Sequence, residues 1–288
     1  IAPAMNDRMY ANVATQANLA TLSERGVEVI EPDQGRLASR GEFGRGRLPD
    51  PERLLARAEA ALPTGDRPWD GLRVLVTAGG TREPIDPVRF IGNRSSGRMG
   101  IALAAAAARR GAEVTLIAAN LSLPEPGGVR RIDVETAEQL ALVAAAEFPK
   151  THVLLMAAAP ADFRASTIST GKLVRQDGLE LHLEPTEDIL ASLAAVRGAS
   201  QTIVGFAAEH GGDAVGRARA KLTRKNADLI VLNDVSDPAI GFESADNAVT
   251  LIDRDSEAEV PIASKDAIAE AILVRVDELR AKAARPAG

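Results

Sequence analysis

Residues 73–81 read Arg73-Val74-Leu75-Val76-Thr77-Ala78-Gly79-Gly80-Thr81, an apolar run that ends in a Gly-Gly-Thr turn. Because polar and apolar residues do not alternate in it, the run is typical of a strand buried on both faces, as in parallel sheets covered by helices. Further strand patterns occur at 113–117, 153–158, 202–207 and 229–232, and helical patterns separate them at 100–110, 137–146, 188–195 and 213–225. This order predicts a Rossmann-like α/β fold with a doubly wound, mostly parallel sheet and helices on both faces.

Both ends of the chain add to this α/β region. A late strand at 247–252 and a closing helix at 262–279 follow it, and the polar segment 66–71 precedes it. We therefore divide the chain into 1–65 and 66–288. The first part contains a helical run at 10–24, a strand at 27–30, a Gly/Arg loop at 35–47 and a helix at 51–61. So little apolar material predicts a short N-terminal appendage rather than a free-standing domain.

Composition excludes several classes of function. The 288 residues include 34 Lys and Arg against 40 Asp and Glu, and the net charge of -6 argues against a nucleic-acid partner. Cysteine is absent, which excludes disulfides, Cys-ligated zinc and a thiol nucleophile in this chain. The longest apolar stretch, 101–108, is far shorter than the roughly 20 residues that span a bilayer. We expect a cytoplasmic protein without a membrane partner. The chain has no initiator Met, so we expect it to be part of a longer chain.

A candidate phosphate site lies between the first strand and the first helix of the α/β region. Gly79, Gly80 and Thr81 end the strand, and Ser95, Ser96 and Gly97 precede the helix. Backbone N–H groups at a helix N-terminus bind phosphate, and glycine allows its close approach. The alternative interpretation is a plain turn followed by a plain helix cap.

The connection between this strand and helix does not fit a dinucleotide fold. It is some fifteen residues long, lacks the pattern G-x-G-x-x-G, and the next strand ends in Ala118-Ala119-Asn120, without an acidic residue for a ribose. NAD is disfavoured, although an NAD(P)- or flavin-linked oxidoreductase stays an alternative. A polar connection of this length is usually functional.

Other candidate residues follow the later strands or lie near them. Ala158 and Asp162 follow the strand at 153–158, and Asp162 could bind a ribose, an amino group or Mg²⁺, or could cap a helix. Phe206 ends another strand. The candidate phosphate-binding cations are Lys172 on a loop and Lys221, Arg224 and Lys225 on one helix face. The alternative interpretation is that these side chains are solvated and bind no ligand.

Five motifs in order resemble phosphopantothenoylcysteine synthetase, one half of the bifunctional bacterial coenzyme A biosynthesis proteins. They are residues 77–89, 93–100, the Ala-rich stretch that ends in Asp162, 205–209 and 225–228. The resemblance covers about residues 70–280. Residues 1–63 resemble the C-terminal end of the partner half, the FMN-dependent phosphopantothenoylcysteine decarboxylase, whose substrate-binding Pro-x-Met-Asn motif matches Pro3-Ala4-Met5-Asn6.

The resemblance implies a ligase that condenses 4'-phosphopantothenate with L-cysteine through an acyl-cytidylate, converting CTP to CMP and pyrophosphate with Mg²⁺. It implies catalytic roles for Asn93 and Lys172 and a substrate contact from Asn6. We further expect substrate contacts from Asn93 and Arg89, and we expect Asp162, which follows a strand directly, to be a magnesium ligand. The implied nucleotide site consists of Gly79, Gly80, Thr81, Ser95, Ser96, Gly97, Ala158, Asp162, Lys172, Phe206, Lys221 and Lys225. Where the family carries Lys-x-Lys-Lys, this chain has Lys172-Leu173-Val174-Arg175.

The decarboxylase part departs further from its family. Residues 38–47 keep the glycines and arginine of a catalytic flap but not its Cys, and the catalytic His and most FMN-binding residues would precede residue 1. We expect no decarboxylase activity from this chain alone, and FMN only in the other part of that half. A non-catalytic binding or regulatory module stays a second alternative to the ligase.

We also expect a homodimer through residues 70–280, and a higher oligomer in the full-length bifunctional protein. An exposed edge strand at 247–252 is usually paired or covered. Leu121, Leu123 and Pro124 lie in a tract, 111–126, with little local structure to bury them. The related synthetases are dimers, so the resemblance also implies a dimer.

Overall fold

The computed structural model describes residues 1–37, 42–61, 67–174, 179–209, 211–234 and 246–284. The chain divides into two compact units, Ile1–Gly65 and Asp66–Gly288. Residues 38–41 of the flap-like segment, Asp66 at the expected boundary and Arg175 lie outside the described residues.

A sheet of eight strands forms the centre of the second unit, in the order β14-β13-β12-β11-β8-β3-β6-β7. Its strands are β3 (Arg73–Gly79), β6 (Glu113–Ala119), β7 (Arg130–Val134), β8 (Val153–Met156), β11 (Thr202–Glu209), β12 (Leu229–Asp234), β13 (Asp246–Ile252) and β14 (Glu257–Ser264). The strands from β12 to β7 are parallel, and β13 and β14 run antiparallel to their neighbours. The predicted doubly wound, mostly parallel α/β fold is confirmed.

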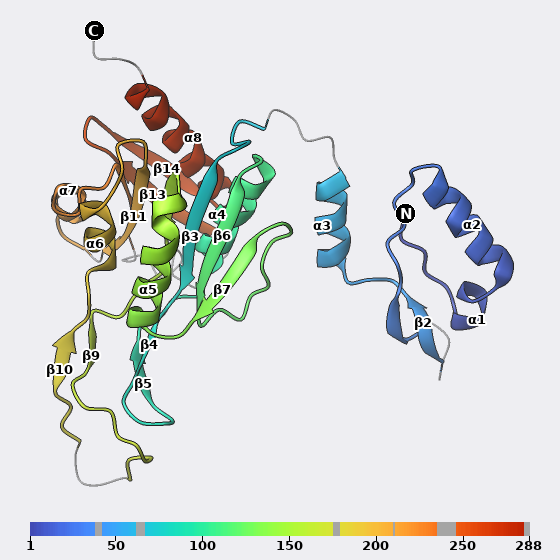
Figure 1. The fold of residues 1–288 in the computed structure, drawn as a ribbon, viewed down its shortest axis with the longest axis horizontal. Coiled ribbons are helices and arrows are strands. Elements are labelled where there is room, and N and C mark those ends of the chain that lie inside the picture. Colours follow the sequence, from blue (N-terminus) through green and yellow to red (C-terminus); the bar gives the residue numbers. More distant parts are fainter. Residues whose placement is uncertain (38–41, 62–66, 175–178, 210, 235–245, 285–288) are drawn as a thin grey trace. The chain divides into compact units, whose positions relative to one another are not determined.

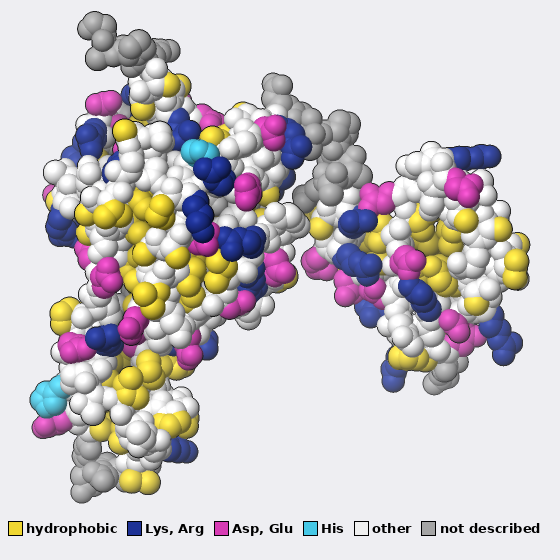
Figure 2. All heavy atoms as spheres, viewed as in Figure 1, with side chains coloured by type: hydrophobic (Ala, Val, Ile, Leu, Met, Phe, Trp, Pro, Cys, Tyr) yellow, Lys and Arg dark blue, Asp and Glu magenta, His cyan; other side chains and the backbone are white. Residues whose placement is uncertain are grey.

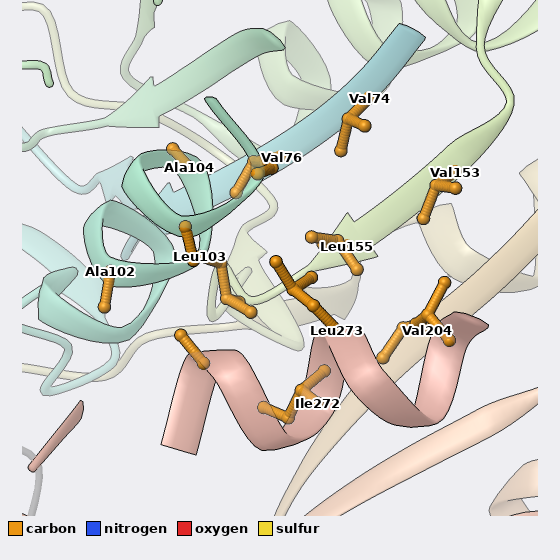
Figure 3. Close-up of a cluster of buried hydrophobic side chains, with 14 of the residues drawn as sticks. Val74, Val76, Ala102, Leu103, Ala104, Val153, Leu155, Val204, Ile272 and Leu273 are labelled. Atoms are coloured by element: carbon orange, nitrogen blue, oxygen red, sulfur yellow. The ribbon is translucent and has the colours of Figure 1, made fainter. Parts of the chain in front are cut away.

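Helices cover both faces of this sheet (Figure 1). They are α4 (Arg98–Arg109) and α8 (Lys265–Ala283) on one face and α5 (Ala137–Glu147), α6 (Ile189–Ala195) and α7 (Ala214–Arg224) on the other. Successive residues of a strand point to opposite faces, so β3 gives Val74 and Val76 to the first core and Leu75 to the second. Figure 3 shows the first core, where Leu103 of α4 and Leu273 of α8 lie against the sheet.

Two short hairpins extend from the carboxyl side of the sheet as an arm (Figure 1). One consists of β4 (Arg82–Pro84) and β5 (Phe90–Gly92), and the other of β9 (Phe163–Ala165) and β10 (Leu183–Pro185). The long connection after β3 is therefore a hairpin and not an irregular loop. Figure 2 shows hydrophobic side chains on the surface of this arm, and acidic and basic side chains mixed over the visible face of the second unit.

The first unit is small. It contains α1 (Asp7–Tyr10), α2 (Val13–Glu24), the antiparallel hairpin of β1 (Asp33–Arg36) and β2 (Phe43–Arg47), and α3 (Pro51–Ala61). The expected strand at 27–30 is wrong: these residues are not in a strand, and Ile30 N–H donates to the carbonyl oxygen of Ile1. The Gly/Arg loop forms a hairpin. Among the described residues of this unit, the buried hydrophobic side chains are those of Tyr10, Pro32 and Pro49.

The structure corrects both structural reasons given for a dimer. The edge of the strand at 247–252 is covered, because β14 pairs with β13 along it. Leu121 is buried in the first core, and Leu123 packs against it. The closing helix begins later than expected, at Lys265, because β14 takes up residues 257–264. The dimer itself stays a prediction.

Candidate functional site

A pocket of about 800 Å³ opens at the carboxyl ends of the parallel strands. Its walls come from the segment before α4, the segment after β8, and the ends of β11 and β12. The chain passes from β3 outward to β6 and β7, then returns to place β8 on the other side of β3, so strand order reverses between β3 and β8. Ligands of doubly wound sheets bind in the crevice at such a reversal.

The N-terminus of α4 forms one wall, with Ser95, Ser96 and Gly97. The first N–H groups of a helix have no partner within it and favour an anion. Gly97 has φ 72°, and a Cβ on it would lie 2.2 Å from Cδ1 of Leu121. Glycine is therefore required where the chain enters this helix.

The Gly-Gly-Thr turn supports the pocket from behind. Gly80 N–H donates to the carbonyl oxygen of Ala119 at 3.1 Å, and Thr81 N–H donates to that of Ala159 at 3.4 Å. Thr81 is buried, its Oγ1 accepts Ala161 N–H at 2.8 Å, and the Gly79 carbonyl accepts Ala159 N–H. This corrects the expectation that these residues offer backbone N–H groups to phosphate, because the N–H groups of Gly80 and Thr81 already bind protein carbonyls and none of the three residues lines the pocket.

Asn93 lies in the wall of the pocket, between β5 and α4. Its Nδ2 donates to the carbonyl oxygen of Pro160 at 2.9 Å, which ties it to the segment after β8. An amide has a second N–H and an acceptor oxygen, so a residue held in this way can still contact a bound molecule with both.

The pocket lining also contains basic side chains, Arg94 and Arg98 around the start of α4 and Lys221 and Lys225 from α7 and its C-cap. Lys221 Nζ donates to the carbonyl oxygen of Phe206 at 2.7 Å, and Lys225 pairs with the Asp188 carboxylate. Burial lowers the pKa of Lys225, and the nearby charge of Asp162 opposes that shift. Ala158 is buried in the wall, and Asp162 is exposed at the rim.

Several polar residues of the pocket were not among the predicted site residues: Arg94, Arg98, Thr186, Glu187, Asp188, Asn233, Asn247 and Lys265. Asn233, Asn247 and Lys265 come from β12, β13 and the start of α8, and the last two are buried. The Asn233 Oδ1 is buried and has no hydrogen-bond partner among the described residues. A position at the carboxyl end of a strand was a signal for Asn233, but no local pattern marks Asn247 or Lys265.

Three expected site residues lie elsewhere. Lys172 is exposed on the arm, and Arg89 pairs there with Asp86; neither lines the pocket. Asn6 belongs to the first unit, where its Oδ1 accepts Met9 N–H at 2.8 Å and caps α1.

The described residues contain no cluster of three or more acidic or histidine groups that could hold a metal. Asp162 lines the pocket together with Glu187 and Asp188. Mg²⁺ is commonly held by one or two carboxylates together with substrate phosphates, so Asp162 fits a magnesium ion that arrives with a nucleotide. No helix in the described ranges is long and apolar enough to cross a bilayer.

Comparisons with known proteins agree with this architecture. Residues 69–279 match the family model of the DNA/pantothenate metabolism flavoprotein C-terminal domain, and residues 1–62 match the Flavoprotein model. The chain is 43% identical over 281 residues to the coenzyme A biosynthesis bifunctional protein CoaBC of Vibrio cholerae, covering 96% of this chain and 69% of the relative. It is 45% identical over 289 residues to that of Mycobacterium bovis, covering 94% and 68%. A crystal structure of the C-terminal domain of a CoaBC protein superposes with a TM-score of 0.64 at 34% identity, covering 75% of this chain and 98% of that one.

Proposed function

The chain belongs to the family of the DNA/pantothenate metabolism flavoprotein C-terminal domain, and from this premise we propose how its pocket carries out the family's reaction. The protein is a ligase of coenzyme A biosynthesis that joins 4'-phosphopantothenate to L-cysteine. We assign this reaction to residues 66–288, with the nucleotide in the pocket between α4 and α7.

The observation that supports this proposal is that two anion-binding features line one pocket. They are the N-terminus of α4 and the side chains of Lys221 and Lys225. A nucleoside triphosphate carries several negative charges that must be neutralised before a second anion, the substrate carboxylate, can approach. Fixed cations and backbone dipoles do this without reorganising during the reaction.

The chemistry has two steps. The carboxylate oxygen of phosphopantothenate bonds to the α-phosphorus of the nucleotide, and the bond from that phosphorus to the pyrophosphate oxygen breaks. The cysteine amine then bonds to the acyl carbon, loses a proton, and expels the nucleoside monophosphate. Mg²⁺, when bound, neutralises charge on the phosphates.

The residues divide between these steps. Lys172 supplies a cation to the first step, in which negative charge accumulates on the leaving pyrophosphate. Asn93 serves the second step, because a neutral amide can polarise the acyl carbonyl and accept a hydrogen bond from the incoming amine. Arg89 provides a further cation on the arm for the phosphorylated substrate.

We propose CTP as the nucleotide. The test is pyrophosphate release by the purified chain with each nucleotide, with and without phosphopantothenate and cysteine. Release from CTP that requires phosphopantothenate but not cysteine is the expected result. Equal release from ATP would refute the preference for CTP, and no release from any nucleotide would refute the ligase mechanism in this pocket.

For residues 1–65 we propose a C-terminal remnant of a flavoprotein decarboxylase domain. The match of residues 1–62 to the Flavoprotein model supports this assignment. A thiol is absent from the whole chain, so this part cannot supply the catalytic Cys of the decarboxylase family. Decarboxylation and FMN binding would then require residues that this chain lacks, and we expect that the chain does not quench the fluorescence of added FMN.

A further inference from the structure

Asp86 is the most strongly held carboxylate of the arm. Its side chain is fully buried in the turn between β4 and β5. One oxygen, Oδ1, accepts the N–H groups of Val88 and Arg89, both at 2.7 Å. These two hydrogen bonds close the turn locally, as Asp side chains commonly do.

The other oxygen of Asp86 reaches across the arm. Oδ2 accepts Leu173 N–H at 3.1 Å and the Arg89 guanidinium at 2.7 Å. The same guanidinium nitrogen donates to the carbonyl oxygen of Leu173 at 3.0 Å. Both backbone polar groups of Leu173 are thus held by the Asp86–Arg89 pair, which we call the clamp.

The clamp joins two segments that are far apart in sequence. A second contact beside it supports the same junction, because Ser169 N–H donates to the carbonyl oxygen of Ile85 at 3.0 Å. Burial opposes ionisation of Asp86, but the N–H groups of Val88, Leu173 and Arg89 and the Arg89 charge outweigh it, so the pKa of this carboxyl lies below its usual value. The Asp86 carboxyl is therefore ionised at neutral pH.

We propose that Asp86 is a positioning residue for Lys172: through the clamp on Leu173 it fixes the backbone from which the Lys172 ammonium reaches the triphosphate. Lys172 is exposed and has four rotatable side-chain bonds, so its backbone is the part that the fold can hold. This inference rests on the proposed function of Lys172 in the first step. It adds a residue outside the pocket on which that step depends.

Asp86→Asn tests the clamp with little change of shape. The amide oxygen can still accept the N–H groups of Val88 and Arg89, but an NH₂ group then faces Leu173 N–H and the guanidinium, which are donors. Asp253→Asn is a matched control. Asp253 is buried in the turn between β13 and β14, its Oδ1 accepts the N–H groups of Asp255 and Ser256, and its Oδ2 accepts from Arg275.

The first readout separates the two chemical steps. In Asp86→Asn we expect single-turnover pyrophosphate release to slow by about 10- to 100-fold, as for other small misplacements of a reacting group. Transfer of a preformed acyl-nucleotide to cysteine should keep its rate. A general structural defect would slow both steps. The control Asp253→Asn should not slow one step more than the other. Equal slowing of both steps in Asp86→Asn, or of neither, would overturn the positioning role.

The second readout does not depend on activity. Because the chain has no cysteine, Lys172→Cys introduces a single thiol for a nitroxide spin label. We expect the electron paramagnetic resonance lines of this label to sharpen when Asp86→Asn is added and to stay unchanged with Asp253→Asn. Unchanged lines in Asp86→Asn would overturn the clamp. If the unsubstituted chain, which keeps Lys172, releases no pyrophosphate while the labelled Lys172→Cys chain shows the sharpening, the proposed function is refuted and the clamp is established.

Discussion

Asn93 Nδ2 donates a 2.9 Å hydrogen bond to the carbonyl oxygen of Pro160. The bond connects the segment that enters α4 with the segment that leaves β8, two walls of one pocket that are 67 residues apart in sequence. It holds the amide at the reversal of strand order, where we propose that the acyl group and the nucleotide meet.

Asn93→Asp should separate the two steps of the reaction. A carboxylate cannot donate to Pro160 and adds negative charge beside the acyl phosphate, so we expect condensation to fall by about 10²- to 10³-fold, as when a single stabilising donor is lost. The first step should continue and the acyl-nucleotide should accumulate. Mass spectrometry of quenched reactions measures it, and its absence would contradict the role given to Asn93.

Lys172→Gln should have the opposite effect. Without the ammonium group we expect no acyl-nucleotide and little pyrophosphate release, because the charge of the leaving group is no longer neutralised. Lys150→Gln is the control, since Lys150 is also exposed but lies at the other end of the strands, just before β8. An intermediate that forms at the normal rate in Lys172→Gln would show that another cation serves this step.

Nucleotide affinity should weaken at alkaline pH because of Lys225. Burial lowers the pKa of this ammonium, so its charge is present at low pH and is lost as the pH rises, before the usual lysine value of about 10.4 is reached. In Lys225→Arg the charge persists, because guanidinium does not deprotonate in proteins. Calorimetric titration with CTP should therefore show that the affinity falls as the pH rises, and that it falls less in Lys225→Arg than in the parent chain. Identical affinity profiles of the two chains would contradict the role given to the Lys225 charge.

Gly97→Ala should destabilise the second unit by about 2–4 kcal/mol, from overpacking against Leu121 together with the left-handed backbone. Gly128→Ala separates the two causes, because Gly128 has φ 77° but no atom within 4 Å of the added Cβ. It should lose only about 1 kcal/mol. Urea unfolding measures both variants, and equal losses would mean that the Leu121 contact is not responsible.

We expect a homodimer, with a new structural reason in place of those corrected above. Lys172 does not line the pocket of its own chain, and the arm that carries it exposes Ile168 and Val174, at 54% and 79% of their full surface. A second copy would bury such side chains and could bring Lys172 to the partner's pocket. Light scattering should give a dimer at micromolar concentration and a monomer without turnover for Val174→Glu. A monomeric parent chain that turns over normally would refute the shared site.

Local sequence determined the layered architecture. Apolar strand runs such as 153–156 must be buried on both faces. The helices that alternate with such strands therefore cover both faces of a parallel sheet, so the α/β order predicts the fold. Where the pattern was weak, strands were not predicted. β7 and β14 lie at the two edges of the sheet and carry many polar residues, so neither has the apolar run that marks an inner strand.

The motifs also identified the segments that form the pocket wall, because the carboxyl end of a parallel strand lies at the binding edge wherever the strand is placed. Asn93, Ser95, Asp162, Phe206 and Lys225 all lie there. What each one contacts was beyond such reasoning. A backbone N–H binds whichever acceptor lies nearest in space, and for Gly80 and Thr81 that acceptor is a carbonyl of another strand or loop and not a phosphate.

Only the tertiary structure brought Asn247 and Lys265 into the pocket and tied Asp86 to Leu173. These contacts join segments that are separated by tens of residues, and their partners are chosen by the packing of strands and hairpins rather than by neighbouring residues. Periodicity and motif spacing report on the interactions of a segment with its own neighbourhood. The hydrogen bonds that hold the site together cross between segments, so they exist only once the sheet and its arm are assembled.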